Sequence, residues 1–357
     1  MKAMIKPIAA LAMLAFSAPA FAGGMTVAED GDSKLKIGAK FYVNLTAQKT
    51  TDQTGTLGKT TGVAVDRAYF SVGYAFNDIW SMGLTTDFQI ESGLKKRSNV
   101  YIKKAYLQGK FSDAVVLQAG IIGTPWIGYE EGLMRHRYVN KTFVDTYKLD
   151  SSADAGIGLK GKLADGLFAY HITEVNGAGY GNISKTNAMD FNGRIGVYPV
   201  EGLTLDFQYR DGYKGTKTWD AAKQANVPGV RHTLLQGMAS YGMDSWRLGG
   251  NIISEKAKDK AALINPVTKS NGYDAWGWVN FADSLGAFGR YEYLKVKKDG
   301  TIIQPKTTRY VAGLEWFARK NVTFSLAYDY SKTKDSGFVK GNFVKNTKAG
   351  LFSEIKF

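Results

Sequence analysis

One group of closely spaced basic residues lies in the segment 123–150, where Arg135, His136 and Arg137 are consecutive and Lys141 follows four residues later. The planar guanidinium group of arginine donates two parallel hydrogen bonds to phosphate or carboxylate, and lysine adds a compact positive charge. The same segment holds as many acidic as basic residues, so its net charge is zero. These residues predict a group that contacts small anions, held in a segment of mixed charge.

Alternating segments elsewhere in the chain place more charged residues on their polar face. Two interpretations stay open: pairs of opposite charge that stiffen a wet wall, or separate basic and acidic walls that create a transverse electric field. The basic candidates are Arg67, Arg194, Arg210, Arg247, Arg290 and Arg309, and the candidates for an opposing acidic wall are Asp87, Asp206, Glu292 and Glu315.

Sequence signatures of catalysis and of metal binding are missing. The chain has three histidines and no cysteine, which excludes disulfides, thiolate metal sites and a cysteine nucleophile. It contains no H-E-x-x-H, G-x-S-x-G or Walker motif. We therefore expect no enzymatic activity, no cofactor and no metal.

The first 22 residues have the features of a secretory signal peptide. Two lysines precede the apolar run 8–16, and Ala20-Phe21-Ala22 matches an A-x-A cleavage site. We expect 1–22 to be cleaved and 23–33 to remain as a short polar lead. Cleavage leaves 44 basic and 32 acidic residues, and an exported basic protein has little access to DNA, so no nucleic acid partner is expected.

Beyond residue 33 the dominant hydrophobic period is two, which is the period of β-strands. Leu203, Leu205, Phe207 and Tyr209, for example, alternate with polar residues. Most alternating segments reach the roughly 9–11 residues that a tilted strand needs to cross the hydrocarbon of a membrane. Sixteen segments have the pattern, at 34–47, 62–76, 79–90, 99–111, 115–122, 151–163, 167–176, 188–198, 203–210, 231–243, 246–255, 272–282, 287–296, 307–317, 322–331 and 346–357.

The connections between these segments alternate between short and long. This is typical of a closed transmembrane barrel with tight turns at one end and long loops at the other, and aromatic residues near the segment ends agree with interfacial girdles. The predicted fold is therefore all-β, an antiparallel transmembrane β-barrel of about 16 strands over 34–357, wide enough for an aqueous channel. The long loops fall at 48–61, 91–98, 123–150, 177–187, 211–230, 256–271, 297–306 and 332–345.

The last segment, 346–357, resembles the C-terminal strand of Gram-negative outer-membrane porins, because it alternates and ends in an aromatic residue, Phe357. In those porins the barrel-insertion machinery recognises the final aromatic residue, so the resemblance implies that Phe357 is a barrel-assembly signal. It also implies a multi-pass barrel in the bacterial outer membrane, short periplasmic turns, a periplasmic lead at 23–33 and a homotrimer. Such proteins form water-filled channels for passive diffusion of small hydrophilic solutes.

Four short motifs are similar to the phosphate-selective porin family: Arg67–Phe70, Lys104–Leu107, Gln118–Gly120 and Pro125–Trp126. In that family, as in general porins, the third loop folds inward and narrows the pore. The resemblance therefore implies that the third loop, 123–150, forms a constriction. Its basic residues would then face the permeant.

The predicted long loops hold thirteen more basic than acidic residues, and the rest of the mature chain is close to neutral. A basic rim concentrates anions at the mouth of a pore, an effect that fades beyond a Debye length of about 8 Å. The alternative is that these lysines pair with lipopolysaccharide phosphates or keep the loops soluble. We expect a porin that favours small, phosphate-like anions and that has outer-membrane lipid as a further partner. The alternative function is that of an outer-membrane enzyme, or of an adhesin or structural barrel without an open pore.

Overall fold

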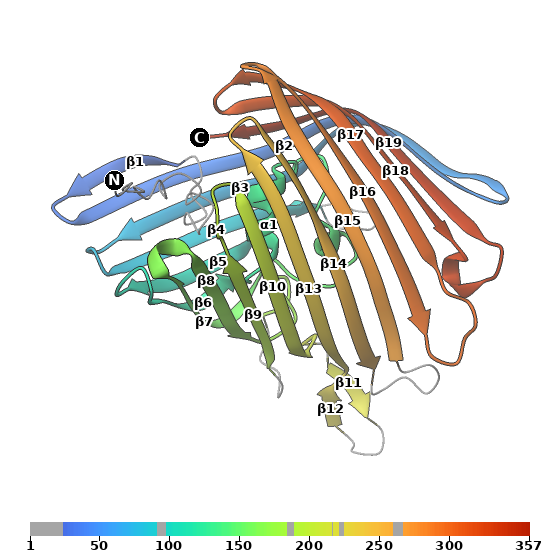
Figure 1. The fold of residues 1–357 in the computed structure, drawn as a ribbon, viewed down its shortest axis with the longest axis horizontal. Helices are drawn as coiled ribbons and strands as arrows, with labels where there is room; N and C mark the ends of the chain where they lie inside the picture. Colours follow the sequence, from blue (N-terminus) through green and yellow to red (C-terminus); the bar gives the residue numbers. More distant parts are fainter. Residues whose placement is uncertain (1–23, 91–97, 184–188, 216, 221–224, 260–266) are drawn as a thin grey trace, which may run out of the picture.

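The computed structural model describes residues 24–90, 98–183, 189–215, 217–220, 225–259 and 267–357. The predicted signal peptide, 1–22, lies outside these residues. The described chain forms a closed antiparallel β-barrel of 16 strands (Figure 1), which confirms the predicted fold class and the multi-pass architecture of an outer-membrane barrel. No helix in the described segments is long and apolar enough to cross a membrane.

Each barrel strand pairs antiparallel with its neighbours in the chain, and the last strand pairs with the first to close the sheet, so no edge is left open. The strands are β2 (Ser33–Asp52), β3 (Gly55–Ala75), β4 (Trp80–Ile90), β5 (Ser98–Lys110), β6 (Val116–Gly123), β7 (Ala153–Leu163), β8 (Phe168–Val175), β9 (Asp190–Val197), β10 (Leu203–Tyr213), β13 (Val230–Met243), β14 (Trp246–Asp259), β15 (Val267–Ala282), β16 (Leu285–Lys298), β17 (Lys306–Arg319), β18 (Val322–Lys334) and β19 (Phe343–Lys356).

The pleat of each strand separates an apolar exterior from a polar interior. On β14, Leu248 and Ile252 point outward and are 61% and 69% exposed, whereas Asn251 and Glu255 point inward and are buried. A water-soluble protein rarely exposes so many large aliphatic side chains on one continuous face. The exterior is therefore built to contact lipid, and the interior to hold polar groups.

Several connections differ from the prediction because strands continue beyond the apolar pattern. In the predicted loop 48–61, β2 and β3 continue to a two-residue turn at 53–54. The hairpins β14–β15, β16–β17 and β18–β19 are lengthened in the same way, because polar Thr and Lys residues pair as well as apolar ones once a register is set. Alternation of hydrophobicity detects only the membrane-spanning part of such strands.

Two smaller strand elements were also not predicted. Part of the lead 23–33 forms β1 (Met25–Asp30), which folds back on the start of β2. Within the predicted loop 211–230, β11 (Lys217–Asp220) pairs with β12 (Ala225–Pro228) as a separate hairpin. Short 3-10 turns, η2 (Ala164–Gly166) and η3 (Ser336–Phe338), complete the connections.

The third loop, 123–150, runs inside the barrel (Figure 1). It contains two helices, α1 (Ile127–Met134) and α2 (Phe143–Thr146). Trp126 and Phe143 have no solvent exposure. A loop whose large apolar side chains are this deeply buried is a packed part of the interior, and it fixes the shape of the remaining lumen.

Candidate pore constriction

Apolar packing holds the third loop against one side of the barrel wall. Trp126, Leu133 and Phe143 of the loop belong to one buried cluster with inward-facing residues of β13 to β16, among them Met238 and Trp276. A second cluster places Tyr138 and Val139 against β15 to β19 and β2. Full burial of each large side chain stabilises the docked loop by about 1.5–3 kcal/mol. The loop is therefore packed against this side of the inner wall.

Polar contacts set the position of α1 on the wall. Asn251 of β14 donates from Nδ2 to Glu130 Oε1 (2.8 Å) and to Asp274 Oδ1 (2.7 Å), and Trp126 Nε1 donates to Glu130 Oε2 (3.0 Å). Trp278 Nε1 donates to the Leu133 carbonyl (3.0 Å). Burial raises the pKa of Glu130 well above its ordinary value, and the nearby Asp274 raises it further.

Tyrosine hydroxyls of the loop donate to wall carboxylates. Tyr129 Oη lies 2.9 Å from Asp206, Tyr138 Oη lies 2.8 Å from Glu315, and Tyr147 Oη lies 3.0 Å from Glu292. Each bond joins residues more than 70 positions apart in the chain. Three of the predicted acidic residues therefore serve as anchors for the loop, with acceptor atoms taken up by the protein itself.

The predicted arginines of the wall are mostly paired with carboxylates beside them. Arg67 lies 3.3 Å from Asp87, Arg290 lies 2.8 Å from Glu292, and Arg309 lies 2.7 Å from Asp329. Three further arginines complete the set: Arg194 pairs with Asp206, Arg210 pairs with Asp150 and Asp190, and Arg247 donates to the Gly202 carbonyl and to Ser240.

The prediction of an opposing acidic wall is therefore wrong. Asp87, Asp206 and Glu292 lie next to predicted arginines on the same wall, and Glu315 contacts His136 and Tyr138 of the loop. The physical reason is register: antiparallel pairing places Arg67 and Asp87, and Arg194 and Asp206, on neighbouring strands within contact, and a buried charge without a partner is costly. The alternative of paired, stiffening charges describes most of these residues.

The basic residues of the third loop have three different environments. Arg137 lies 2.7 Å from Glu131 and 3.6 Å from Asp145, and Lys141 lies 3.3 Å from Asp145. Burial alone lowers the pKa of Arg137, but Glu131, Tyr69 and Asp145 outweigh it and raise the pKa above its ordinary value. The Arg135 guanidinium stacks over the Trp278 ring at 4.1 Å, with no carboxylate partner among the described residues.

A cavity of about 280 Å³ lies between the third loop and the wall of β2 to β5. Its lining includes two acidic residues, Glu131 and Glu354, against five basic ones. Two of the predicted residues, Arg135 and Arg137, are brought together here. The basic lining residues are Lys40, Lys103, Lys104, Arg135 and Arg137.

Lys103 and Lys104 were missed by the sequence analysis, and a β-bulge explains how both reach the lumen. The β4–β5 register shifts at this point, so that Thr85 lies opposite Lys104 and Thr86 lies opposite Ile102, with Lys103 as the extra residue. Lys103 donates to Tyr69 Oη (3.2 Å) and lies over that ring at 4.4 Å. Consecutive lysines in an alternating segment were the available signal, since strict alternation would send one of them into lipid.

Most lysines of the predicted basic rim lie on the outer face of the barrel, away from the pore mouth. These lysines lie on the lengthened parts of the strands. Because side chains alternate between the two faces of a strand, the lysines point outward, on the same face as lipid-facing residues such as Leu314 and Leu326. The predicted rim is thus corrected for these positions, and Lys95, Lys96 and Arg97 lie outside the described residues. We call the outward-facing set the lysine belt: Lys49, Lys59, Lys256, Lys269, Lys295, Lys297, Lys306, Lys332, Lys334 and Lys345.

Phe357 closes the barrel through its backbone. Its amide donates to the Ala39 carbonyl (3.1 Å), and its carbonyl accepts from the Ala39 amide (3.2 Å). The ring itself is 45% exposed. The side chain is thus available for contacts outside this chain, whereas the backbone contributes to the last strand pair.

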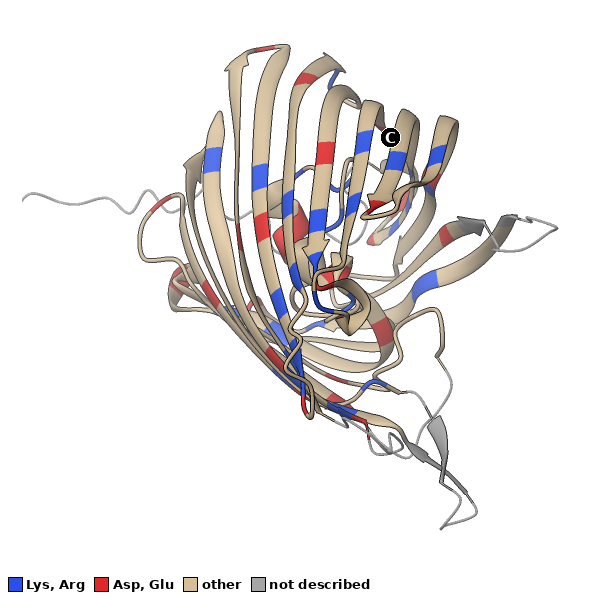
Figure 2. Cartoon of the chain, turned by 90° about the vertical axis from the view of Figure 1, so that its right-hand side faces the viewer, with Lys and Arg blue, Asp and Glu red and all other residues tan. Residues whose placement is uncertain are grey.

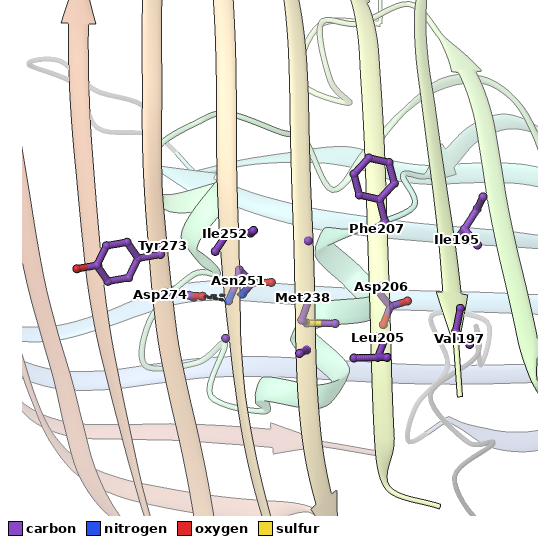
Figure 3. Close-up of a pocket in the computed structure, with 13 residues that line it drawn as sticks. Ile195, Val197, Leu205, Asp206, Phe207, Met238, Asn251, Ile252, Tyr273 and Asp274 are labelled. Carbon is purple, nitrogen blue, oxygen red and sulfur yellow. Dashed lines mark hydrogen bonds between the residues drawn. The ribbon is translucent and has the colours of Figure 1, made fainter. Parts of the chain in front are cut away.

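A larger hollow of about 780 Å³ lies on the outside of the barrel, over β9, β10 and β13 to β15. Figure 3 shows Ile195, Phe207, Ile252 and Tyr273 around it, all on the outward face of their strands. Gly237 and Gly250 leave the space between them. Because its border is apolar and faces outward, this hollow belongs to the lipid-facing surface and not to the lumen.

No protein-family model and no curated protein sequence matches the chain. Solved structures with the same architecture are outer-membrane barrels. The outer membrane channel DcaP of Acinetobacter baumannii has 11% sequence identity and a TM-score of 0.62, covering 94% of this chain and 100% of that one. The anion-selective porin from Comamonas acidovorans has 11% identity and a TM-score of 0.61, covering 91% and 100%. OmpT of Vibrio cholerae in its trimer form has 13% identity and a TM-score of 0.56, covering 90% and 99%. This similarity defines the fold as that of outer-membrane porins.

Proposed function

We propose that the chain is a bacterial outer-membrane porin that passes small hydrophilic solutes by diffusion and favours anions. The observation that carries the proposal is the cavity beside the third loop. Of its five basic residues, Arg137 is paired with Glu131, and Lys40 lies 3.7 Å from Glu354. The other three, Lys103, Lys104 and Arg135, have no carboxylate partner in the part of the chain that the structure describes.

Uncompensated cations in a narrow, partly dry passage attract anions more strongly than the same charges in bulk water. Lysine and arginine side chains also replace part of the hydration that a phosphate or carboxylate loses on entry. The favoured permeants are therefore small anions, with inorganic phosphate as the candidate that the motifs similar to phosphate-selective porins suggest. One structural neighbour is described as an anion-selective porin, which supports the same direction.

Planar-bilayer recordings of the purified protein test this function. We expect steady open channels and, in a KCl gradient, a reversal potential with the sign for chloride preference. Block of the chloride current by micromolar phosphate would assign phosphate selectivity, and no block at millimolar phosphate would assign a general anion preference. Silent bilayers after many insertions would refute the pore, and cation preference would refute the anion bias.

An outer-membrane enzyme is less well supported than a channel. His232 lies between Asp190 (3.2 Å) and Glu255 (3.4 Å), and His136 lies 3.0 Å from Glu315. Both imidazoles are buried, so neither is open to a substrate in the lumen. That the chain has no enzymatic activity stays a prediction, and the conductance measurement also tests the alternative of a structural barrel without an open pore.

We further propose cleavage after residue 22, a periplasmic lead at 23–33, a constriction at 123–150, recognition of Phe357 during assembly, and a homotrimer. One structural neighbour is described as a trimer form, which supports the last of these. Outer-leaflet lipid is the proposed partner of the exterior. Mass determination of the mature protein tests the cleavage site. Electrophoresis of the unheated protein tests the trimer, because folded porin trimers migrate as one species.

A further inference from the structure

Two glycines of α1 face the cavity beside the third loop. Gly128 and Gly132 are four residues apart, which puts them on one face of the helix, and both line the cavity. Both residues are exposed, whereas Ile127 and Leu133 pack into the buried cluster that holds the loop on the wall. At these two positions α1 therefore presents only backbone to the lumen.

Neither packing nor backbone conformation requires glycine at these positions. A Cβ atom added at Gly128 or Gly132 would meet no atom of another described element within 4 Å, and neither residue has a positive φ. Glycine inside a helix is less favourable than alanine, because it loses more conformational freedom on folding. The two glycines therefore lower the stability of α1 and leave open space in the cavity, where a ligand can approach the backbone closely.

The barrel wall contributes two aromatic rings to the same cavity. Tyr42 of β2 and Tyr69 of β3 line it, and their ring centroids are 6.0 Å apart at an interplanar angle of 85°. Aromatic rings bind other flat rings through offset-stacked and edge-to-face contacts. The lining therefore includes flat apolar surface on the wall as well as the bare face of α1.

The cations of the cavity provide a place for a negative group. Lys103, Lys104 and Arg135 have no carboxylate partner in the part of the chain that the structure describes. Lys103 and Lys104 are adjacent on β5, where the bulge turns both toward the lumen. Figure 2, with Lys and Arg in blue and Asp and Glu in red, shows charges of both signs on the strands of the wall. Two adjacent lysines without a carboxylate partner therefore mark one end of the cavity for an anion.

The volume of the cavity, about 280 Å³, is close to the lower end of small-molecule sites, which occupy roughly 300–1,000 Å³. A chloride or phosphate ion would contact the cations and leave the apolar surfaces in contact with water. An anion that carries one flat ring would contact both the cations and the apolar surfaces.

A sugar phosphate would match the charge of the site less economically, because its hydroxyl groups need hydrogen-bond partners. The two acidic residues of the lining are paired with Arg137 and Lys40, and the hydroxyls of Ser71 and Thr85 bond to each other (3.1 Å). A flat apolar ring needs no such partners. The lining therefore favours an aromatic ring over a sugar.

We propose that this cavity binds carboxylates that carry an aromatic ring. The ring lies against Gly128 and Gly132 of α1 and against the ring of Tyr69. The carboxylate group lies at the ammonium groups of Lys103 and Lys104. The inference rests on the proposed function, since it names the class of solute that the same cavity favours among small anions.

The first test is binding of benzoate to the purified full chain in detergent, followed by ligand-detected NMR titration with protein-free detergent as the blank. Acetate has the carboxylate without the ring, and benzamide has the ring without the charge. We expect benzoate to bind about tenfold more tightly than either, because only benzoate uses both parts of the site. Glucose 6-phosphate represents the sugar phosphates and is expected to bind more weakly than benzoate.

The variant G128A/G132A tests where the ring lies. It adds two methyl groups to the open space, so benzoate should bind about tenfold more weakly, and acetate should bind within about twofold of its affinity for the wild type. The melting temperature should equal or exceed that of the wild type, because alanine favours the helix. A fall in melting temperature would show that the added methyl groups disturb the fold, and the single variant G132A would then decide the place of the ring.

The matched control is G58A/G62A, which adds the same two groups at exposed positions of β3 with equally open surroundings. The control should bind benzoate as the wild type does. Equal affinities of the wild type for benzoate and acetate, tighter binding of glucose 6-phosphate than of benzoate, or unchanged benzoate binding by the folded glycine variants would each overturn the proposal.

Bilayer recordings in parallel separate this proposal from the proposed function. Benzoate should reduce the chloride current at concentrations at which acetate does not. Silent bilayers with benzoate binding intact would refute the pore alone. Open, anion-selective channels without ring-dependent binding would refute the aromatic site alone.

Discussion

Neutralising Lys103 and Lys104 is the sharpest perturbation of the proposed anion preference. Both residues line the cavity beside the third loop, and together with Arg135 they are its cations without a carboxylate partner in the described segments. The variant K103Q/K104Q shortens each side chain by one bond and keeps a group that donates hydrogen bonds. It therefore removes charge from the lumen with little change in its shape.

The size of the effect follows from Coulomb's law. A chloride ion about 5 Å from one ammonium group is attracted by about 0.8 kcal/mol in a water-like medium. Two such groups give about 1.6 kcal/mol, and screening over a Debye length of about 8 Å roughly halves this value. Potassium is repelled by the same amount, which doubles the difference between the two ions. We therefore expect the chloride-to-potassium permeability ratio to fall roughly fifteenfold, and up to about two-hundredfold if the passage is poorly screened.

The assay is the reversal potential in a KCl gradient, recorded with K103Q/K104Q, with the charge-retaining K103R/K104R, and with K320Q/K340Q as a control. The arginine variant should keep the anion preference, and the control should match the wild type, because its lysines lie in exposed turns. An unchanged permeability ratio in K103Q/K104Q, with folded protein and normal conductance, would refute the assignment of these two lysines as the source of selectivity.

Three further predictions concern loop docking and assembly. Phe143→Ala should weaken docking of the third loop by about 3–5 kcal/mol, because the ring is fully buried; single-channel recordings should show a larger or noisier conductance, and an unchanged channel would contradict the docking argument. The pKa of Glu130 is raised in the folded protein, so ionisation of this carboxyl group destabilises the fold. This destabilisation is absent at a pH below the pKa that Glu130 has in the unfolded chain. It grows as the pH rises toward the pKa of Glu130 in the folded protein. The neutral variant E130Q should therefore gain in melting temperature relative to the wild type as the pH rises above the ordinary glutamate pKa of about 4.3, and a difference that is constant with pH would count against a buried carboxyl with a raised pKa. Phe357→Ala should reduce the amount of assembled barrel in cells and leave the melting temperature of the purified folded protein nearly unchanged. The reason is that the ring is exposed and the backbone hydrogen bonds to Ala39 remain. Equal losses of assembly and of stability would point to a structural role.

Much of the fold could be predicted because strand patterning is local. Outward residues such as Leu203, Leu205 and Phe207 alternate with inward polar ones, and this period alone identified the sixteen membrane-spanning segments. Turn-forming residues between segments separated one strand from the next. Strand ends were less predictable, since the polar extensions of β2, β3 and β14 to β19 lack the hydrophobic signal.

The candidate site was only partly predictable. Arg135 and Arg137 were expected near the permeant, and both line the cavity. Lys103 and Lys104 were not expected there, because the bulge that turns both inward depends on the register between β4 and β5. The direction of the lysine belt was unpredictable for the same reason. When a segment is taken for a loop, its sequence does not show whether a lysine in it points outward or into the lumen.

The sequence by itself therefore determined the class of fold, the number of strands and which residues alternate, because each follows from the chemistry of neighbouring residues. Only the tertiary structure decided which charges meet. Tyr138 and Glu315 are 177 residues apart, and closure of the sheet and inward folding of the third loop bring them to 2.8 Å. Ion pairs between strands compensate most of the predicted arginines, and Lys103, Lys104 and Arg135 beside the loop have no carboxylate partner among the residues that the structure describes. Register then placed the remaining lysines toward lipid, because one position along a strand reverses the face of every side chain.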